Sequence, residues 1–158
     1  MNIKVRFAEP SDAKEICNLL DIYVPLGIVL PRDEEDILFY IKNFSVAVDE
    51  NNKICGCVAA RDFGNDLLEV RSLVVNPDYQ GIGVGRKLIE FIIAKLKRER
   101  ASWRLFTLTL QVDFFTKMGF TTVVKELFPD KIWSDCSKCA KKNCCDETAM
   151  LLESTQVD

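Results

Sequence analysis

Three glycines alternate with other residues along 81–85, in the segment QGIGVG, where an apolar run ends and an amphipathic run begins. Glycine adopts positive φ angles at little cost and lets a ligand approach the backbone closely. A glycine turn at a helix start therefore presents several backbone N–H groups, reinforced by the helix dipole, to an anion such as phosphate. The alternative is that Gly81, Gly83 and Gly85 only close the corner between a strand and a helix.

Several better-known motifs are excluded. The dinucleotide fingerprint G-x-G-x-x-G requires two residues before its last glycine, whereas one residue separates Gly83 from Gly85. The nucleotide-hydrolase loop requires G-K-[ST], but Arg86 and Lys87 follow Gly85. The chain contains no histidine, which excludes Ser–His nucleophile pairs and histidine metal ligands. A general base is therefore sought among the carboxylates.

Two charged residues interrupt the apolar run that precedes the glycines. Because alternate residues of a strand share a face, we expect Glu69, Arg71, Leu73 and Val75 to form one row. One hypothesis is that this row lines a cleft, in which the carboxylate acts as a general base. The other is that the strand lies at a sheet edge, where Glu69 and Arg71 are solvated or paired with each other.

Four of the seven cysteines lie within ten residues near the C-terminus. A C-x-x-C pair at Cys136 and Cys139, followed closely by Cys144 and Cys145, has a spacing that suits tetrahedral zinc. Adjacent cysteines rarely ligate the same ion together. The alternatives are thiols packed as small hydrophobes and a disulfide formed on oxidation.

The elements that must position these residues follow from hydrophobic periodicity and turn residues. We expect strands over 3–9, 66–76, 103–110, 120–124 and 147–153, and a hairpin of two strands within 44–62 around Asn51 and Asn52. We expect helices that start at Ser11 or Asp12 and after Pro31, and further helices over 83–100 and 111–119. Asp12 with Glu15 is a candidate capping box for the first helix. The order β-α-α-β-β-β-α-β-α-β-β predicts an α/β fold, a mixed seven-stranded sheet flanked by about four helices. We expect one domain over 1–158, with a Cys-rich loop over 129–147.

Length and composition limit the function classes. The chain has 158 residues and a net charge of −3, enough for one well-packed core and without the basic excess of a nucleic-acid-binding domain. No apolar run approaches the ~20 residues of a membrane span. The N-terminus is charged and alternating, unlike a signal peptide. We therefore expect a cytoplasmic protein with neither nucleic acid nor membrane as partner.

The pattern V-x-N-P-x-Y-Q-G-x-G-V-G, followed by a helix and later by FF-x-K-x-GF, resembles the GNAT superfamily of acetyl-CoA-dependent N-acetyltransferases. The superfamily signature [QR]-x-x-G-x-[GA] falls on Gln80, Gly83 and Gly85. The resemblance implies that the loop backbone holds the pyrophosphate of coenzyme A and that the preceding strand pairs with the pantetheine arm. The cofactor-binding residues that it implies are Leu73, Val74, Val75, Gln80, Gly81, Ile82, Gly83, Val84, Gly85, Arg86 and Phe115.

The same resemblance assigns the chemistry. Glu69 stands where several members carry a glutamate that takes a proton from the substrate ammonium, so that the neutral amine can attack the thioester. Many members protonate the departing thiolate with a tyrosine, but this chain has Phe114 and Phe115 in that segment. Thr109 matches a hydroxyl residue of one branch and is the candidate to bond the thiolate or to orient a water.

That branch is the N-acetylglutamate synthases, in particular short bacterial members without an amino-acid-kinase domain. Three blocks resemble it: the helix start L-x-x-R with the following F-x-V-A and I-x-G-C, the segment F-x-L-T…FF-x-x-x-GF, and the cysteine-rich tail. The implied acceptor is L-glutamate, in the first step of arginine biosynthesis. Its two carboxylates favour Arg32, Arg71 and Lys131 as substrate-binding residues. Alternatively, Arg32 balances the acidic run 33–36 at the surface. Asp33 departs from the Ser or Thr usual at its position.

The tail of this branch matches three of the cysteines, Cys136, Cys139 and Cys145, as the ligands of a candidate zinc site. A second hypothesis keeps the fold and acetyl-CoA but changes the acceptor to another amino acid, a polyamine or a protein N-terminus. A polyamine site would need an acidic lining, which Arg32 and Arg71 oppose. A third is a non-catalytic sensor that binds acetyl-CoA or a metal. A homodimer is compatible with each.

Overall fold

The predicted element order is confirmed in the computed structural model, which describes residues 2–127 and 147–154. Seven strands form one mixed sheet in the order β1-β2-β3-β4-β5-β7-β6. They are β1 (Lys4–Phe7), β2 (Phe44–Val48), β3 (Ile54–Asp62), β4 (Leu67–Val75), β5 (Arg104–Thr109), β6 (Thr121–Val123) and β7 (Thr148–Glu153). The α-helices are α1 (Ala13–Tyr23), α2 (Glu34–Phe39), α3 (Val84–Glu99) and α4 (Val112–Lys117). Short 3-10 turns are η1 (Pro10–Asp12), η2 (Ile41–Asn43), η3 (Pro77–Tyr79) and η4 (Lys125–Leu127).

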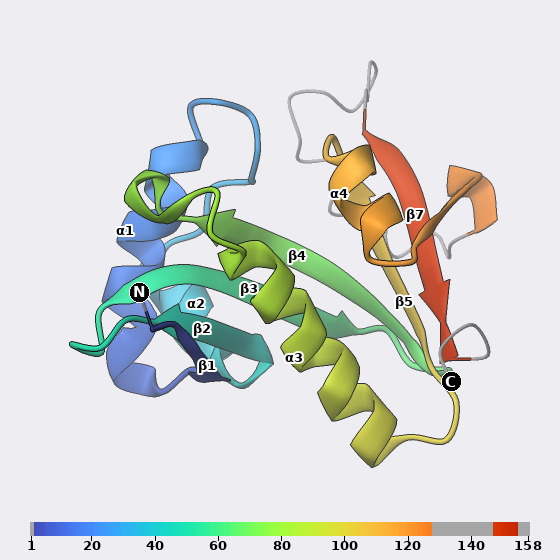
Figure 1. The fold of residues 1–158 in the computed structure, drawn as a ribbon, viewed down its shortest axis with the longest axis horizontal. Coiled ribbons are helices and arrows are strands. Elements are labelled where there is room, and N and C mark those ends of the chain that lie inside the picture. Colours follow the sequence, from blue (N-terminus) through green and yellow to red (C-terminus); the bar gives the residue numbers. More distant parts are fainter. Residues whose placement is uncertain (1, 128–146, 155–158) are drawn as a thin grey trace.

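The helices cover the two faces of the sheet (Figure 1). The apolar residues of α3 and α4 join one core cluster with Val70 and Leu105, whereas α1 and α2 join a second with Val46 and Cys57. The approach of α3 to the sheet depends on Gly56, where an added Cβ would lie 2.9 Å from Val84 Cγ1 and 3.2 Å from the backbone oxygen of Val74.

Local hydrogen bonds differ in part from those expected at the helix starts. Asp33 begins α2 as predicted for an acidic first turn, because its side chain accepts from the backbone N–H of Asp36 at 2.8 Å. The capping box expected for Asp12 and Glu15 is wrong. Asp12 instead accepts from the backbone N–H of Glu9 at 2.7 Å, and Glu15 accepts from the N–H of Ile54 at 2.7 Å.

A β-bulge in β4 changes which side chains share a face. Cys57 lies opposite Val74 and Ala59 opposite Arg71, so two residues of β4 oppose Val58 alone. Ser72 sits in this bulge with a φ of 55°. The expected single row of Glu69, Arg71, Leu73 and Val75 is therefore wrong. Glu69 and Arg71 share the α1–α2 face with Val74, while Leu73 and Val75 pack with the α3 cluster.

The sheet opens between β4 and β5. These parallel strands pair only from Leu67–Arg104 to Glu69–Phe106 and then diverge, as the green and yellow-orange strands in Figure 1 show. At the fork, the hydroxyl of Thr107 donates to the carbonyl oxygen of Val70 at 3.2 Å in place of a ladder bond. β4 is an interior strand, so the hypothesis that places Glu69 at a sheet edge is wrong.

Within the described residues, none of the helices is long and apolar enough to cross a membrane.

Candidate active site

A cavity of about 700 Å³ fills the opening between β4 and β5. Its walls are residues 70–75 of β4 and 107–111 at the end of β5, with the glycine loop and the start of α3 at one end. Phe114 and Phe115 of α4 close one side and Tyr23 at the end of α1 closes another. The fork in the sheet, which the sequence pattern did not predict, is therefore what creates the site.

The glycine loop has the shape of an anion cradle. Gly81 and Gly83 have φ angles of 82° and 85°, and an added Cβ at either would meet nothing within 4 Å. Gly83 is the N-cap of α3, and no side chain caps the first turn. Its backbone N–H groups therefore remain available to a ligand. Gly81, Gly83, Val84, Gly85 and Arg86 line the cavity. Ile82 does not line it, and its side chain is 46% exposed.

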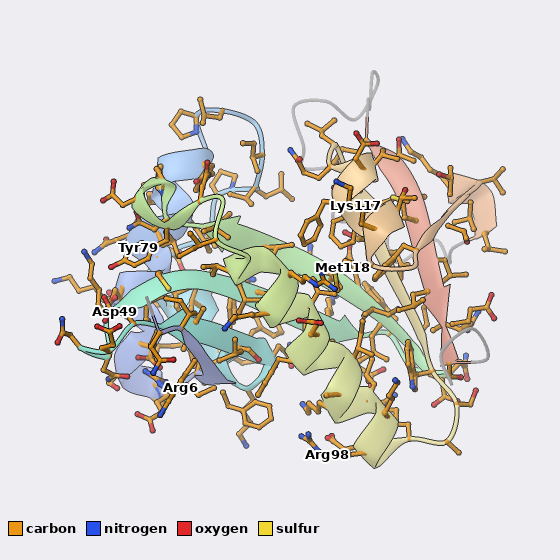
Figure 2. All side chains as sticks on the ribbon, viewed as in Figure 1. Arg6, Asp49, Tyr79, Arg98, Lys117 and Met118 are labelled. Carbon is orange, nitrogen blue, oxygen red and sulfur yellow. The ribbon has the colours of Figure 1, made fainter. Side chains whose placement is uncertain are left out.

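The two residues before the loop are held by distant elements. The hydroxyl of Tyr79 donates to Asp49 Oδ2 at 2.9 Å, on the β2–β3 hairpin (Figure 2). This bond, followed by burial, raises the pKa of Tyr79, while the backbone N–H of Lys53, followed by the same bond, lowers the pKa of Asp49. Gln80 Nε2 donates to the Tyr23 hydroxyl at 2.9 Å, and that hydroxyl donates to the carbonyl oxygen of Val75.

Glu69 lies at the apex of the fork, directly before the residues that line the cavity. Its side chain is 9% exposed, and its Oε1 lies 3.7 Å from Nε of Arg71, which does line the cavity. The two residues are thus paired, as one hypothesis held, but on a buried strand instead of at an edge. Glu69 does not itself line the cavity, whereas the next residue, Val70, does. A carboxylate withdrawn from bulk water at such a position can accept a proton from a bound ammonium, directly or through one water.

Arg32 is neither a solvated surface residue nor a cavity-lining one. Its side chain is 15% exposed, and its guanidinium stacks 5.0 Å from the ring centroid of Phe44. Its Nε donates to Asp36 Oδ2 at 2.6 Å, and its Nη1 lies 3.5 Å from Ser72 Oγ. Ser72 is part of the cavity wall, so Arg32 contacts a wall residue without lining the cavity itself.

The end of β5 supplies a hydroxyl group and two rings. Thr109 is 7% exposed, and its Oγ1 accepts from the backbone N–H of Gln111 at 2.8 Å. A hydroxyl that accepts one bond can still donate its own hydrogen. The Phe114 ring would lie 3.5 Å from a Cβ on Gly85, and it packs edge-on against Phe115 at 5.0 Å. Phe115 is 2% exposed and belongs to the core as well as to the cavity wall.

The described cysteines are not poised as nucleophiles. Burial raises the pKa of the Cys57 thiol to about 12, and its Sγ donates to the carbonyl oxygen of Ser72. Burial also raises the pKa of Cys17 and Cys55. The reactive thiolate form is therefore scarce at these three positions near neutral pH.

The structure brings most of the predicted site residues to one cavity. Those that line it are Arg71, Leu73, Val74, Val75, Gln80, Gly81, Gly83, Val84, Gly85, Arg86, Thr109 and Phe115. Lys131 and the candidate zinc ligands Cys136, Cys139 and Cys145 lie outside the described residues. In the part of the chain that is described, no cluster of His, Cys, Asp or Glu could hold a metal ion.

Tyr23, Tyr79 and Phe114 also line the cavity, although the sequence patterns did not predict them as site residues. Tyr79 and Phe114 stand inside the two motifs that identify the loop and the later helix, so their position was a usable indication. Tyr23 had none, because it reaches Gln80 from 57 positions earlier in the chain.

Comparison with known proteins assigns the family. A model of the acetyltransferase (GNAT) domain matches residues 38–122, which is more than half of the chain. The chain belongs to this family. It is an acetyl-CoA-dependent N-acetyltransferase, and the GNAT resemblance and α/β fold expected from the sequence are confirmed.

Relatives of this acetyltransferase include an uncharacterised N-acetyltransferase of Chlorobaculum tepidum, which is 40% identical over 93% of this chain and 94% of that protein. An amino-acid acetyltransferase of Mycobacterium tuberculosis is 31% identical over 75% of this chain and 68% of that protein. The crystal structure of N-acetylglutamate synthase from Neisseria gonorrhoeae with coenzyme A and N-acetyl-glutamate superposes with a TM-score of 0.83 at 27% identity. That match covers 97% of this acetyltransferase but only 35% of the synthase chain.

Proposed function

We propose that this acetyltransferase transfers the acetyl group of acetyl-CoA to the α-amine of L-glutamate. The observation that carries the proposal is the composition of the α1–α2 side of the fork. Glu69, a buried carboxylate, lies there beside Arg71, and Arg32 reaches the same wall through Ser72. One proton acceptor next to two guanidinium groups suits an ammonium substrate that also carries two carboxylates. The names of relatives in the amino-acid acetyltransferase group support the same acceptor class.

Acetyl-CoA would enter from the opposite side of the cavity. The pyrophosphate would accept hydrogen bonds from the backbone of residues 81–86, including Ile82, which does not line the cavity. The pantetheine arm would pair with Leu73, Val74 and Val75, whose strand has no partner in β5 beyond Glu69. Phe115 would contact the arm, and Gln80 would contribute through its backbone while its side chain holds Tyr23. A cavity of about 700 Å³ is large enough for a ligand of this kind.

The proposed reaction is a direct attack. Glu69 takes a proton from the glutamate ammonium, because an ammonium has no lone pair to form a bond. The neutral nitrogen then attacks the thioester carbonyl carbon and forms the new C–N bond. The nitrogen releases its second proton to solvent, and the C–S bond breaks. The departing thiolate accepts a hydrogen bond from Thr109 and takes up a proton from solvent. Thr109 compensates for the absence of a tyrosine beside Phe114, since coenzyme A thiolate leaves readily without a strong acid.

The acceptor is tested by following thiol release from acetyl-CoA with L-glutamate, L-glutamine, L-aspartate, L-lysine and spermidine. We expect the highest kcat/KM for glutamate, and product analysis by mass spectrometry should show N-acetyl-L-glutamate. Glutamine is the matched control, because it lacks only the side-chain carboxylate. Preference for glutamine or spermidine would contradict the assignment of the arginines. Coenzyme A binding without turnover of any acceptor would favour the sensor hypothesis.

The donor site is tested separately with two substitutions at Gly83. Gly83→Asn fills the cradle with a neutral side chain that tolerates positive φ, whereas Gly83→Asp adds a negative charge of the same shape. We expect Gly83→Asp to abolish coenzyme A binding in calorimetry and Gly83→Asn to weaken it much less. Equal affinities in both variants and the wild type would place the pyrophosphate elsewhere.

A further inference from the structure

We propose that Tyr23 and Asp49 are positioning residues for donor binding, because each holds one of the two residues that lead into the glycine loop. The inference rests on the donor site proposed above. It assigns to α1 and to the β2–β3 hairpin, neither of which belongs to the loop, the task of keeping the loop in its ligand-ready shape.

The loop cannot hold this shape through its own packing. Gly81 and Gly83 have no atom within 4 Å of a hypothetical Cβ, and Ile82 is 46% exposed. One end of the loop is fixed, because Val84 is 2% exposed in the core beneath α3. The position of the other end therefore depends on what holds Tyr79 and Gln80.

Two kinds of hydrogen bond act at that end: local bonds within the turn, and bonds to elements far away in the chain. Asn76 accepts from the N–H of Asp78, and the N–H of Tyr79 donates to the Asn76 carbonyl oxygen, so these bonds shape the η3 turn locally. The bonds from Tyr79 to Asp49 and from Gln80 to Tyr23 instead join η3 to elements 30 and 57 residues earlier. They fix where the turn lies relative to the sheet.

The Tyr23 hydroxyl also links the loop to the other part of the donor site. It accepts from Gln80 and donates to the carbonyl oxygen of Val75, the last residue of β4. Tyr23 is 8% exposed, so its ring is fixed by packing and its hydroxyl cannot follow a displaced loop. The Tyr23 hydroxyl thus connects the end of β4, where pantetheine would bind, to the glycine loop, where the pyrophosphate would bind. It thereby holds these two parts of the donor site at a fixed separation.

Removing either hydroxyl should lower the fraction of molecules whose loop is ready for the ligand, which weakens apparent affinity in proportion. For Tyr79→Phe, which loses one hydrogen bond, we expect coenzyme A to bind about three- to tenfold more weakly, and for Tyr23→Phe, which loses two, at least as weakly. Tyr79→Phe removes the bond to Asp49 without disturbing the other carboxylate oxygen, which accepts from the N–H groups of Asn51 and Lys53.

The decisive measurement compares coenzyme A with pantetheine, which lacks the pyrophosphate and nucleotide. Calorimetry gives the coenzyme A affinity, and ligand-observed NMR gives the weaker pantetheine affinity. Tyr79→Phe should keep the pantetheine affinity of the wild type, because its bond to Asp49 does not involve the strand that receives pantetheine. Tyr23→Phe also releases the carbonyl oxygen of Val75, so it should weaken pantetheine as well, but less than coenzyme A. Amide hydrogen exchange at 80–86 in the free protein should be faster in both variants.

Thr121→Val is the matched control, since it also removes a hydroxyl that donates to a backbone oxygen, from the edge strand β6 to Leu151 of β7. We expect it to leave both affinities unchanged. Equal weakening of coenzyme A and pantetheine by Tyr23→Phe would show a general structural role and overturn the proposal. So would a coenzyme A affinity within twofold of the wild type in both tyrosine variants. If Gly83→Asp also left coenzyme A binding intact, the failure would lie in the donor site itself.

Discussion

At the scale of single residues, the proposed chemistry depends on two charged side chains that are largely buried, those of Glu69 and Arg32. Glu69 belongs to the last residue pair before β4 and β5 separate, and Arg32 is held between Phe44 and the acidic start of α2. Neither side chain can rearrange freely, because one is on an interior strand and the other is 15% exposed. Substitution of Glu69 should therefore change mainly the turnover rate, and substitution of Arg32 mainly the KM for the acceptor.

Glu69→Gln should retain coenzyme A binding and lose turnover at neutral pH, because an amide cannot accept the ammonium proton. Loss of a general base typically costs ~10²–10⁴ in rate. The rate should recover in part as pH rises, since more of the amine is then already neutral. Steady-state kinetics from pH 6 to about pH 10 checks this expectation. Near-normal turnover at pH 7 would place the base elsewhere.

Arg32→Ala should raise the KM for glutamate and leave the KM for acetyl-CoA nearly unchanged. Losing a charge-assisted contact costs about 1.5–3 kcal/mol, or roughly 10- to 150-fold in KM. Arg32→Lys should recover little, because an ammonium cannot reproduce the planar guanidinium fork. If both KM values stay flat while stability falls, Arg32 serves the bulge at Ser72 and Asp36 instead of the substrate.

At the scale of elements, the site exists because two regular patterns are interrupted. The bulge at Ser72 turns Leu73 and Val75 toward α3 and leaves Glu69 and Arg71 on the other face. The loss of pairing after Glu69 then opens the sheet between these two sets of side chains. In the proposed function, the donor and the acceptor would therefore approach the same point from opposite faces.

Gly56→Ala should destabilise the fold by about 1–3 kcal/mol, the usual cost of overpacking. The new methyl group would lie 2.9 Å from Val84 Cγ1 and 3.2 Å from the Val74 carbonyl oxygen, so α3 would have to move away from β3. Urea denaturation measures the loss. Gly85→Ala is the control, because its nearest atom would lie at 3.5 Å and alanine favours a helix. Equal stability of the two variants would show that α3 adjusts without cost.

Much of this architecture could be predicted from the sequence, because apolar residues recur with a period of two in strands and 3.6 in helices. The glycine loop was predictable for a similar reason, since positive φ angles favour glycine. The bulge was not, because Ser72 adopts a φ of 55° without a glycine to mark it. Tyr23 was not either, since its role depends on a contact across 57 residues that no local pattern encodes.

At the scale of the whole molecule, an ion pair joins β1 to the turn that precedes α1. Two nitrogens of Arg6 on β1, labelled in Figure 2, donate to the Asp12 carboxylate, Nη1 at 2.8 Å. The same carboxylate accepts from the N–H of Glu9. Burial acts to raise the pKa of Asp12, but the bonds from Arg6 and Glu9 outweigh it and hold the pKa below its ordinary value of 3.8. The charged form is therefore favoured more in the folded chain than in the unfolded one.

Asp12→Asn should cost about 1–3 kcal/mol of unfolding free energy at pH 7. Because the folded pKa is the lower one, the wild-type carboxylate contributes fully above its ordinary pKa and loses this contribution as pH falls through the lowered value. The difference between wild type and variant should accordingly shrink below about pH 4. Urea titrations at pH 7 and pH 3 test this, with the exposed Asp78→Asn as control. A difference that stays constant into acid would contradict the ion pair's role.

The gap between β4 and β5 has a consequence for the stability of this protein and its resistance to degradation in the cell. A sheet that lacks part of a ladder is completed only when a ligand supplies the missing partner, so the donor would act as a temporary structural element. By mass action, a ligand at 100 times its Kd adds about 2.7 kcal/mol to stability. The melting temperature should therefore rise with the logarithm of coenzyme A concentration, and resistance to proteolysis would follow the acetyl-donor supply. The lifetime of such an enzyme in the cell would then be longest when acetyl-CoA is abundant.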